Sequence, residues 1–290
     1  MRSDPSEYEM VVPKDLDSVL ETLDQSPGLW TPIAGGTELM VQFGAGLLNK
    51  RRFLSIWNLA ELRRIEVSPE WLSIGAGSTF SDLRKHKTVL QEFALLTQTA
   101  SWSGSIANQN RGTLGGNIVN GSPAADTPPA LLAYGAEIEV ISLSGSRRLD
   151  YSSFHLGYKQ VDLAPNELVL ALHLPRGNQG CFHYVRKVGA RSAQAISKVA
   201  LAGVGRLKDG VVEHIRIGAA SLAPIPLRCF KTERYLAGRT LSEQTIREAK
   251  ACFIEESSPI DDIRSTAEYR AQVGANLLEE FLIGLKEHRT

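Results

Sequence analysis

The sequence predicts a two-domain α+β fold, and three observations carry that prediction. Short apolar runs typical of strands alternate with helical patterns up to residue 174. A stretch containing Pro and Gly at 175–180 then interrupts the pattern and is the best candidate for a domain boundary. Beyond it, apolar runs precede three helical patterns, an order typical of an α+β domain. The length of 290 residues suits one large or two modest domains.

The first domain is predicted from an amphipathic helix and a series of short strands. Apolar residues recur at helical spacing over 16–23, directly after Asp15, which predicts a helix. Thr79 is a suitable N-cap for a second, short helix through Leu83. Strands are predicted for the apolar runs at residues 31–34, 52–57, 72–75, 137–142 and 168–174. The segment 101–130 is rich in Gly, Asn, Ser, Pro and Thr without periodicity, and it is predicted to be a long functional or disordered loop.

The second domain is predicted to hold a β-hairpin followed by helices. Apolar runs at 200–207 and 211–219 are joined by Lys208–Gly210, which is a strong hairpin signal. Three helical patterns close the chain. In the last of them, over 269–285, apolar residues line one helical face.

Composition excludes several classes of protein. Lys plus Arg equals Asp plus Glu at 32 each, so the charge balance does not favour nucleic acid or anionic lipid. No window approaches the roughly 20 apolar residues that cross a bilayer, and the first ten residues do not form a secretory signal. We therefore expect a cytoplasmic protein that neither binds nucleic acid nor spans a membrane.

The cysteines and histidines do not form a recognisable metal or catalytic motif. Cys181, Cys229 and Cys252 are far apart and are interpreted as buried thiols in a reducing compartment. An iron–sulfur or zinc centre would therefore have to belong to a partner chain. No His pair has metal spacing and no G-x-S-x-G elbow is present, so hydrolase chemistry has no support.

The first segment that could carry chemistry is Ala34–Leu39, with the sequence AGGTEL. Glycines let the backbone approach a ligand closely, and consecutive N–H groups can form a nest for phosphate or pyrophosphate. The segment lacks the Lys of a Walker motif and the G-x-G-x-x-G spacing of a Rossmann motif. Taken alone, it favours a plain tight turn over an anion site.

The second segment is Arg111–Asn117, RGTLGGN, followed by Ser122–Pro129, SPAADTPP. It offers another pair of glycines and a hydroxyl, while Asn117 and Asp126 can hydrogen-bond a polar ring edge or a polyol. Two glycine-pair loops in one domain fit a ligand with two phosphates and a long polar linker, and a dinucleotide such as FAD matches that description. The alternative is an ordinary surface loop rich in Gly and Pro.

The third segment is His183–Arg191, HYVRKVGAR. A charge run such as Arg186, Lys187 and Arg191 is usually a solvated face. A lysine delivered into a cofactor cleft would instead stabilise negative charge, such as that of a reduced flavin.

In combination, these segments resemble the FAD-binding medium subunits of molybdenum hydroxylases, the group of xanthine dehydrogenase and carbon monoxide dehydrogenase. The resemblance runs from about Tyr8 to beyond Leu236, and the order and spacing of the motifs carry it. It implies a PCMH-type FAD-binding domain of two α+β subdomains over 1–177, with a subdomain break near 57–62. It also implies a CO dehydrogenase flavoprotein-type C-terminal domain over 178–290, with a small antiparallel sheet and a three-helix bundle.

The resemblance further implies which residues bind FAD. Lys187 matches a flavin-contacting lysine that an Ile-containing helix over 193–199 follows, and Val169 stands where the family often has a Leu near the flavin. The sequence departs from the family at 108–110, which reads Asn-Gln-Asn instead of Ile-Arg-Asn. The implied FAD-binding residues are Pro32, Ile33, Ala34, Gly35, Gly36, Thr37, Glu38, Leu39, Thr113, Leu114, Gly115, Gly116, Asn117, Ser122, Asp126, Val169 and Lys187.

The function implied by the resemblance is electron transfer within a larger oxidoreductase. A large partner subunit would carry the molybdenum cofactor and oxidise the substrate, and a small partner subunit would carry [2Fe–2S] clusters. The FAD of this chain would pass the electrons to NAD⁺ or another acceptor, most simply in a xanthine dehydrogenase-like complex built as a dimer of heterotrimers. The chain itself would hold neither a metal nor a residue catalytic on the organic substrate.

Two other functions remain open from the sequence. The chain could be a self-contained FAD-dependent reductase or oxidase of the same FAD-domain superfamily, such as a UDP-N-acetylenolpyruvylglucosamine reductase or a vanillyl-alcohol-type oxidase. It could also be a non-catalytic assembly module whose glycine loops are only turns.

Overall fold

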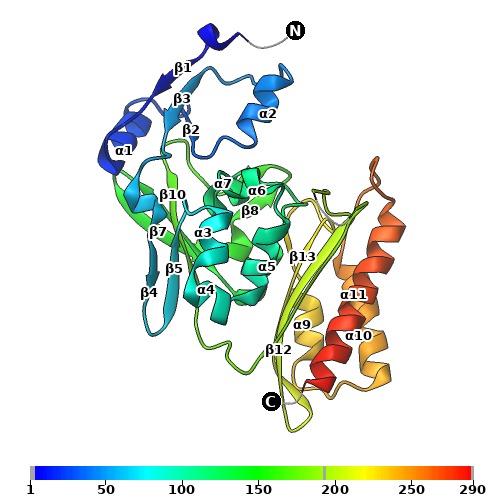
Figure 1. The fold of residues 1–290 in the computed structure, drawn as a ribbon. Coiled ribbons are helices and arrows are strands. Elements are labelled where there is room, and N and C mark those ends of the chain that lie inside the picture. Colours follow the sequence, from blue (N-terminus) through cyan, green and yellow to red (C-terminus); the bar gives the residue numbers. More distant parts are fainter. Residues whose placement is uncertain (1–3, 192–193, 289–290) are drawn as a thin grey trace.

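The computed structural model describes residues 4–191 and 194–288, and three larger sheets follow one another along this part of the chain (Figure 1). The first is a parallel sheet of three strands in the order β1-β3-β2. This sheet belongs to the N-terminal unit, which contains η1 (Pro5–Glu7), β1 (Glu9–Val11), α1 (Leu16–Gln25), β2 (Thr31–Ile33), α2 (Leu39–Gly44) and β3 (Arg52–Ser55). Asp15 caps α1 by accepting a hydrogen bond from the Ser18 N–H, and the apolar face of α1 packs on Leu54 of β3. The predicted helix and strands are confirmed, except that β2 ends at Ile33 instead of residue 34 and β3 ends at Ser55 instead of residue 57.

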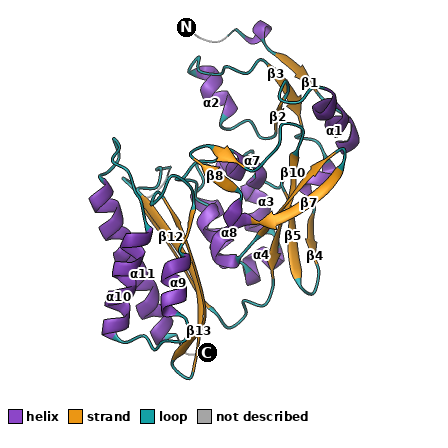
Figure 2. Cartoon of the chain, turned by 180° about the vertical axis from the view of Figure 1, so that it is seen from behind, coloured by secondary structure: helices purple, strands orange, loops and turns teal. Residues whose placement is uncertain are grey.

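The middle unit is an antiparallel sheet of five strands, ordered β4-β5-β10-β6-β7, with helices packed on one face (Figure 2). Its strands are β4 (Ile65–Val67), β5 (Trp71–Gly75), β6 (Glu137–Ser142), β7 (Gly145–Asp150) and β10 (Leu168–Pro175), beside a small pair of β8 (His155–Gly157) and β9 (Gln160–Val161). Its helices are η2 (Ala60–Arg63), α3 (Phe80–Lys85), α4 (Lys87–Glu92), α5 (Ala94–Trp102), α6 (Ile106–Gln109), α7 (Leu114–Val119), α8 (Pro128–Tyr134) and η3 (Tyr151–Ser153). Because side chains alternate along a strand, Leu72, Ile74 and Leu172 all face the helices and form the core with Phe93 and Tyr134.

The predicted long loop at 101–130 is wrong, because this segment contains α6, α7 and the start of α8. Ser105 and Thr113 each cap a helix by accepting a hydrogen bond from the backbone three residues later. Prolines occupy the first positions of α8, where their missing N–H groups need no helical partner. These helices span four to seven residues, which is too short for helical periodicity to show in the sequence. The Thr79 cap on α3 is confirmed, as a capping box with Asp82.

The C-terminal unit is an antiparallel sheet of four strands with three helices on its outer face (Figures 1 and 2). It contains β11 (Phe182–Val188), β12 (Val199–Lys208), β13 (Val211–Ala220), β14 (Leu227–Arg228), α9 (Phe230–Leu236), α10 (Glu243–Glu256) and α11 (Ala267–Glu287). The hairpin between β12 and β13 is confirmed: Asp209 and Gly210 both have positive φ, as a two-residue turn of type I′ requires. Alternate strand residues face opposite ways, so Leu201 packs on α9–α11 while Ala202 joins the core of the middle unit.

The predicted Ile-containing helix after Lys187 is wrong. Ser192 and Ala193 lie outside the described residues, and 194–198 are not helical. Val188 of β11 pairs with Val199 of β12, so the described residues 194–198 belong to a connection between two neighbouring antiparallel strands. Of the three cysteines predicted to be buried, Cys229 is buried, whereas Cys181 and Cys252 are partly exposed. Over the described ranges, none of the helices is long and apolar enough to cross a membrane.

Candidate functional site

A cleft of about 760 Å³ lies where the first two units meet the loop between β11 and β12. This volume falls in the range of sites that enclose small molecules. The N-terminal unit contributes 31–32, 34–39 and 41–42, the middle unit contributes parts of 80–126, and the loop contributes 194–196. Both glycine segments therefore reach the same region, together with residues 194–196, which follow the third segment.

The first glycine segment forms one wall of the cleft and presents free backbone donors. β2 ends at Ile33, and Gly36 adopts φ 73°, a conformation that favours glycine. The backbone N–H groups of residues 35–38 donate to no acceptor among the described residues. Consecutive amides of this kind form a concavity that binds anions such as phosphate groups. The segment is therefore more than a plain tight turn.

The second glycine segment packs directly behind the first. A Cβ atom on Gly35 would lie 1.6 Å from the carbonyl oxygen of Arg111, so only glycine permits this contact. The amides that open α7 are already bonded: Gly115 N–H donates to Ala76 at 2.8 Å and Gly116 N–H donates to the Thr113 hydroxyl at 3.1 Å. The second segment therefore shapes the cleft, but it offers no comparable run of free donors.

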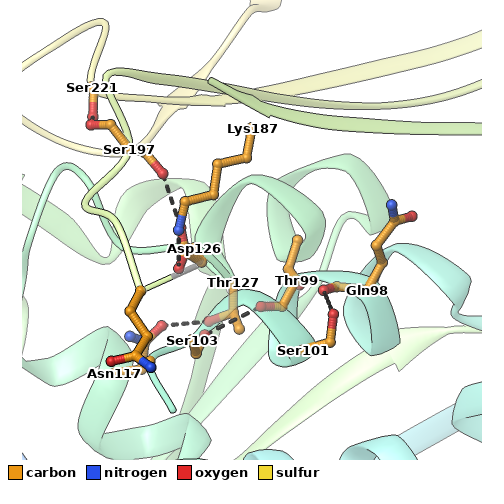
Figure 3. Close-up of polar contacts among 12 residues, drawn as sticks. Gln98, Thr99, Ser101, Ser103, Asn117, Asp126, Thr127, Lys187, Ser197 and Ser221 are labelled. Carbon is orange, nitrogen blue, oxygen red and sulfur yellow. Dashed lines mark hydrogen bonds and ion pairs between the residues drawn. The ribbon is translucent and has the colours of Figure 1, made fainter. Parts of the chain in front are cut away.

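Asp126 and Lys187 form an ion pair at another part of the cleft wall (Figure 3). The Lys187 Nζ donates to Asp126 Oδ2 at 2.9 Å, and the Ser197 hydroxyl donates to Oδ1 at 2.9 Å. Both charged side chains are 12% exposed. Burial raises the pKa of the Asp126 carboxyl, whereas the Lys187 ammonium and the Ser197 hydroxyl oppose that rise. The cleft thus places a balanced charge pair beside any ligand.

Asn117 is held in a fixed orientation at the end of the glycine segment. Its side-chain oxygen accepts a hydrogen bond from the buried Thr127 hydroxyl at 2.5 Å (Figure 3). That bond leaves the amide nitrogen of Asn117, which also lines the cleft, as the group available to a ligand.

Two basic residues of the third segment, Arg186 and Lys187, point in different directions. Lys187 points inward, whereas Arg186 is 60% exposed and lies 3.7 Å from Glu280. Lys187 also lines a smaller cavity of about 260 Å³ together with Trp102, and this cavity shares Gln194 and Ala195 with the main cleft. Arg186 therefore lies on a solvated face, whereas the Lys187 side chain is mostly buried beside the cleft.

The structure brings most of the sequence-predicted site residues to the cleft. Those that line it are Pro32, Ala34, Gly35, Gly36, Thr37, Glu38, Leu39, Thr113, Gly116, Asn117 and Asp126. Lys187 reaches it through Asp126. The others lie behind the wall: Leu114, Gly115 and Val169 are buried, Ile33 packs beneath Gly36, and Ser122 stabilises the turn before Asp126 by accepting from the Ala124 N–H.

Sequence reasoning missed several residues of the cleft. They are Thr31, Val41, Gln42, Phe80, Ser103, Gly104, Asn108, Gly112, Val119, Asn120, Ala124, Ala125, Gln194, Ala195 and Ile196. Gly112, Ala124 and Ala125 lie inside the predicted segments, and many of the others flank them, where a wider window around each segment would find them. Phe80 and Ser103 carry no local signal, because only the tertiary fold brings them to the cleft.

The geometry suits an elongated ligand with phosphates at one end and a polar ring at the other. Free amides supply the phosphate site, while the Asp126–Lys187 pair and the Asn117 amide supply donors and acceptors for a ring edge. Within 4–191 and 194–288, no group of three or more His, Cys, Asp or Glu side chains is placed to hold a metal ion.

Comparison with known proteins agrees with this geometry. Residues 6–177 match the family model of the FAD binding domain in molybdopterin dehydrogenase, and residues 184–285 match that of the CO dehydrogenase flavoprotein C-terminal domain. The xanthine dehydrogenase FAD-binding subunit of Escherichia coli O157:H7 is 31% identical over 242 residues, which is 82% of each chain. The glyceraldehyde dehydrogenase medium chain of Sulfolobus acidocaldarius is 28% identical over 269 residues, 93% of this chain and 95% of that one.

A solved structure shares the whole fold. The carbon monoxide dehydrogenase of Hydrogenophaga pseudoflava that lacks the Mo-pyranopterin moiety contains a chain with a TM-score of 0.92 and 25% identity, covering 96% of this chain and 97% of that one. With both domain models matched along the chain, the protein belongs to the FAD-binding medium subunits of the molybdenum hydroxylases, an oxidoreductase family that includes the xanthine and carbon monoxide dehydrogenases.

Proposed function

We propose that this chain binds FAD along the cleft and acts as the electron-transfer subunit of a xanthine dehydrogenase-like molybdenum hydroxylase. The observation that carries the proposal is the run of unbonded amides at residues 35–38, in the same cleft as the Asp126–Lys187 pair. The diphosphate of FAD fits the amides, and the polar edge of its ring fits the charge pair and Asn117. Bound FAD would supply the redox chemistry, while the protein supplies binding, orientation and electrostatics.

The proposed division of the chain follows its three larger sheets. We assign 1–177 to the FAD domain, with a subdomain break near 57–62, and 178–290 to the C-terminal domain. One hydrophobic cluster is centred on each of the three larger sheets, which supports these boundaries, and Val185, Ala202 and Val204 of the C-terminal sheet pack into the middle cluster across the second boundary. The FAD contacts are assigned to the sequence-predicted residues that line the cleft, together with Lys187.

The electrons that reach the FAD are proposed to come from partner subunits. A small subunit with [2Fe–2S] clusters would deliver them from a large subunit that carries the molybdenum cofactor, in a cytoplasmic dimer of heterotrimers. The names of the relatives include xanthine and glyceraldehyde dehydrogenases. Because chains similar to this one serve dehydrogenases of different substrates, we assign the choice of substrate to the large partner and not to this chain. NAD⁺ is the proposed acceptor.

The experiment is a visible absorption spectrum of the purified chain after incubation with FAD and gel filtration. We expect flavin bands that remain with the protein and that bleach when NADH is added. Gly36→Ala is expected to lose most of the retained flavin, because alanine at φ 73° is strained and shifts the amide nest. Gly44→Ala is the matched control, since a Cβ atom there meets no atom within 4 Å.

Each outcome decides one part of the proposal. If Gly36→Ala and Gly44→Ala retain flavin equally, the amides of residues 35–38 are not the phosphate site. Retained bands that do not respond to NADH would overturn NAD⁺ as the acceptor and leave FAD binding intact. Flavin that binds neither the chain alone nor the chain co-expressed with its partner subunits would overturn the function as a whole.

A further inference from the structure

Both oxygens of the Asp126 carboxylate are bound by groups from the second half of the chain (Figure 3). Lys187, which binds one oxygen, lies on β11. Ser197, which binds the other, lies just before β12 and is 1% exposed. The hydroxyl of Ser197 is therefore withdrawn from solvent and committed to the carboxylate.

The backbone around Ser197 is held from three directions. The Ser221 hydroxyl donates to the carbonyl of Ser197 at 3.0 Å, and Arg270 Nη1 donates to the carbonyl of Lys198 at 2.8 Å. The Lys198 N–H donates to the carbonyl of Val188 at 2.8 Å, one residue beyond the lysine of the ion pair. The peptide groups that carry Ser197 are thus tied to the strand that carries Lys187.

Ser221 closes this network back onto the loop that contains Asp126. Its own N–H donates to the carbonyl of Pro123 at 2.8 Å. Ser221 has φ 64°, which is uncommon for a residue other than glycine. Such outliers persist where the surroundings over-determine them, and they concentrate at functional sites. The conformation of Ser221 lets one residue hold both Ser197 and the Asp126 loop.

Arg270 holds the other side of the network from α11. It is 3% exposed, and its Nη2 donates to Asp262 Oδ1 at 2.6 Å while Nη1 holds the carbonyl of Lys198. Arg270 does not line the cleft and does not contact Asp126. Any influence that it has on the cleft must therefore pass through the backbone of 197–198.

We propose that Ser197, Ser221 and Arg270 are positioning residues that hold the Asp126 carboxylate against the Lys187 ammonium and so set the charge at the flavin end of the cleft. Ser197 acts directly on the carboxylate, and the other two act through the backbone of Ser197. This inference rests on the proposed function, because it assigns the pair to the flavin. It makes the C-terminal domain a control element for a cofactor that the first domain binds.

The test is a double-mutant cycle in the full chain, with the FAD dissociation constant and the flavin midpoint potential as readouts. Ser197→Ala is expected to weaken FAD binding about three- to tenfold, as expected for the net contribution of one hydrogen bond, and to shift the potential. Ser197→Thr keeps the hydroxyl and is expected to restore both. In an Asp126→Ala background, Ser197→Ala is expected to have no further effect, because the two residues act as a unit.

A second readout needs no FAD. Amide hydrogen exchange over 122–127 is expected to accelerate about fivefold in Ser197→Ala and Ser221→Ala. The first variant removes the hydroxyl that binds Asp126, and the second removes the hydroxyl that holds the carbonyl of Ser197. Ser257→Ala is the matched control, since the Ser257 hydroxyl also donates to a carbonyl, that of Ile254 at 2.9 Å, but away from the cleft. Arg270→Lys is a third variant for the same exchange experiment. If Arg270→Lys does not fold, the two serine variants decide the outcome.

The proposal is overturned if Ser197→Ala and Ser221→Ala behave like Ser257→Ala in the exchange experiment. It is also overturned if Ser197→Ala keeps its full effect on FAD binding after Asp126→Ala. If the wild-type chain binds no FAD, the proposed function fails instead, and hydrogen exchange in the cofactor-free chain still decides whether the positioning network exists.

Discussion

Lys187 and its neighbour Arg186 show how one position along a strand separates two chemically similar residues. Side chains alternate between the two faces of a strand, so only one of the pair can point into the cleft. Lys187 points inward and meets a carboxylate, whereas Arg186 remains in solvent. A charge run in the sequence cannot make this distinction, because the direction of each residue depends on the register of β11.

We predict that Lys187→Ala lowers both stability and FAD affinity, because it leaves the Asp126 carboxylate without its countercharge in a buried position. The expected loss is roughly 2–3 kcal/mol in the free energy of unfolding, measured by urea denaturation, with a weaker FAD complex. Arg186→Ala is the matched control, because its exposed ion pair with Glu280 contributes less than about 0.5 kcal/mol. Equal losses in the two variants would refute the assignment of Lys187.

A second residue-scale prediction concerns His155. It is 5% exposed and its Nε2 lies 2.9 Å from the Tyr151 hydroxyl, and burial lowers its pKa from 6.5 to about 4. Between these values the unfolded chain binds a proton that the folded chain does not. The contribution of neutral His155 to the free energy of unfolding is therefore complete above pH 6.5, and it falls as the pH decreases toward 4.

The expected loss from this one group is about 2 kcal/mol at pH 5 relative to pH 7. Urea denaturation at the two pH values measures it, and His155→Phe is expected to reduce the decrease by that amount. His288→Phe serves as the control, because His288 is exposed at the end of the described chain. A decrease of the same size in the wild type and in His155→Phe would show that another group dominates the acid response.

At the scale of elements, α8 connects the cleft to the C-terminal domain. The helix begins directly after Asp126 and Thr127 and ends at Gly135, which takes the left-handed conformation typical of a helix end. Two arginines of the C-terminal domain bind its last carbonyl groups: Arg228 donates to Leu132 at 2.9 Å and Arg216 donates to Tyr134 at 3.0 Å. Cations at a helix C-terminus also complement the helix dipole.

We predict that Arg228→Ala is far more destabilising than Arg206→Ala. Arg228 pairs with Glu233, with both side chains 10% exposed, and its removal leaves a carboxylate whose pKa burial already raises. The expected loss is about 3 kcal/mol by urea denaturation. Arg206 pairs with Glu213 on an exposed hairpin, so Arg206→Ala is expected to change stability by less than about 0.5 kcal/mol. Similar losses would mean that α8 is not anchored by this pair.

Elements with a strong local pattern could be predicted from the sequence, and elements that depend on tertiary partners could not. The helix over 16–25 and the hairpin at 208–211 carry their own periodicity, caps or turn residues. The short helices α6 and α7 are not predicted, because each is stabilised by only one or two capping side chains and by packing. The resemblance implies a helix over 193–199, but the pairing of Val188 with Val199 makes the described residues 194–198 part of a connection between two strands.

On the scale of the whole molecule, the proposed cofactor site is shared by both halves of the chain. The first half supplies the amide nest and Asp126, and the second supplies Lys187, Ser197 and the wall at 194–196. The sequence identified the glycine segments, but it could not show which of their amides remain free. The amides at the start of α7 are not free, because they donate to the carbonyl groups of Ala76 and Ser78, which are distant in sequence.

The measurement that tests the central claim most directly is a crystal structure of this chain with FAD. Our account predicts diphosphate oxygens within hydrogen-bond distance of the amides of residues 35–38 and the isoalloxazine edge beside Asp126 and Lys187. FAD bound with its diphosphate at the start of α7, or outside the cleft, would contradict it.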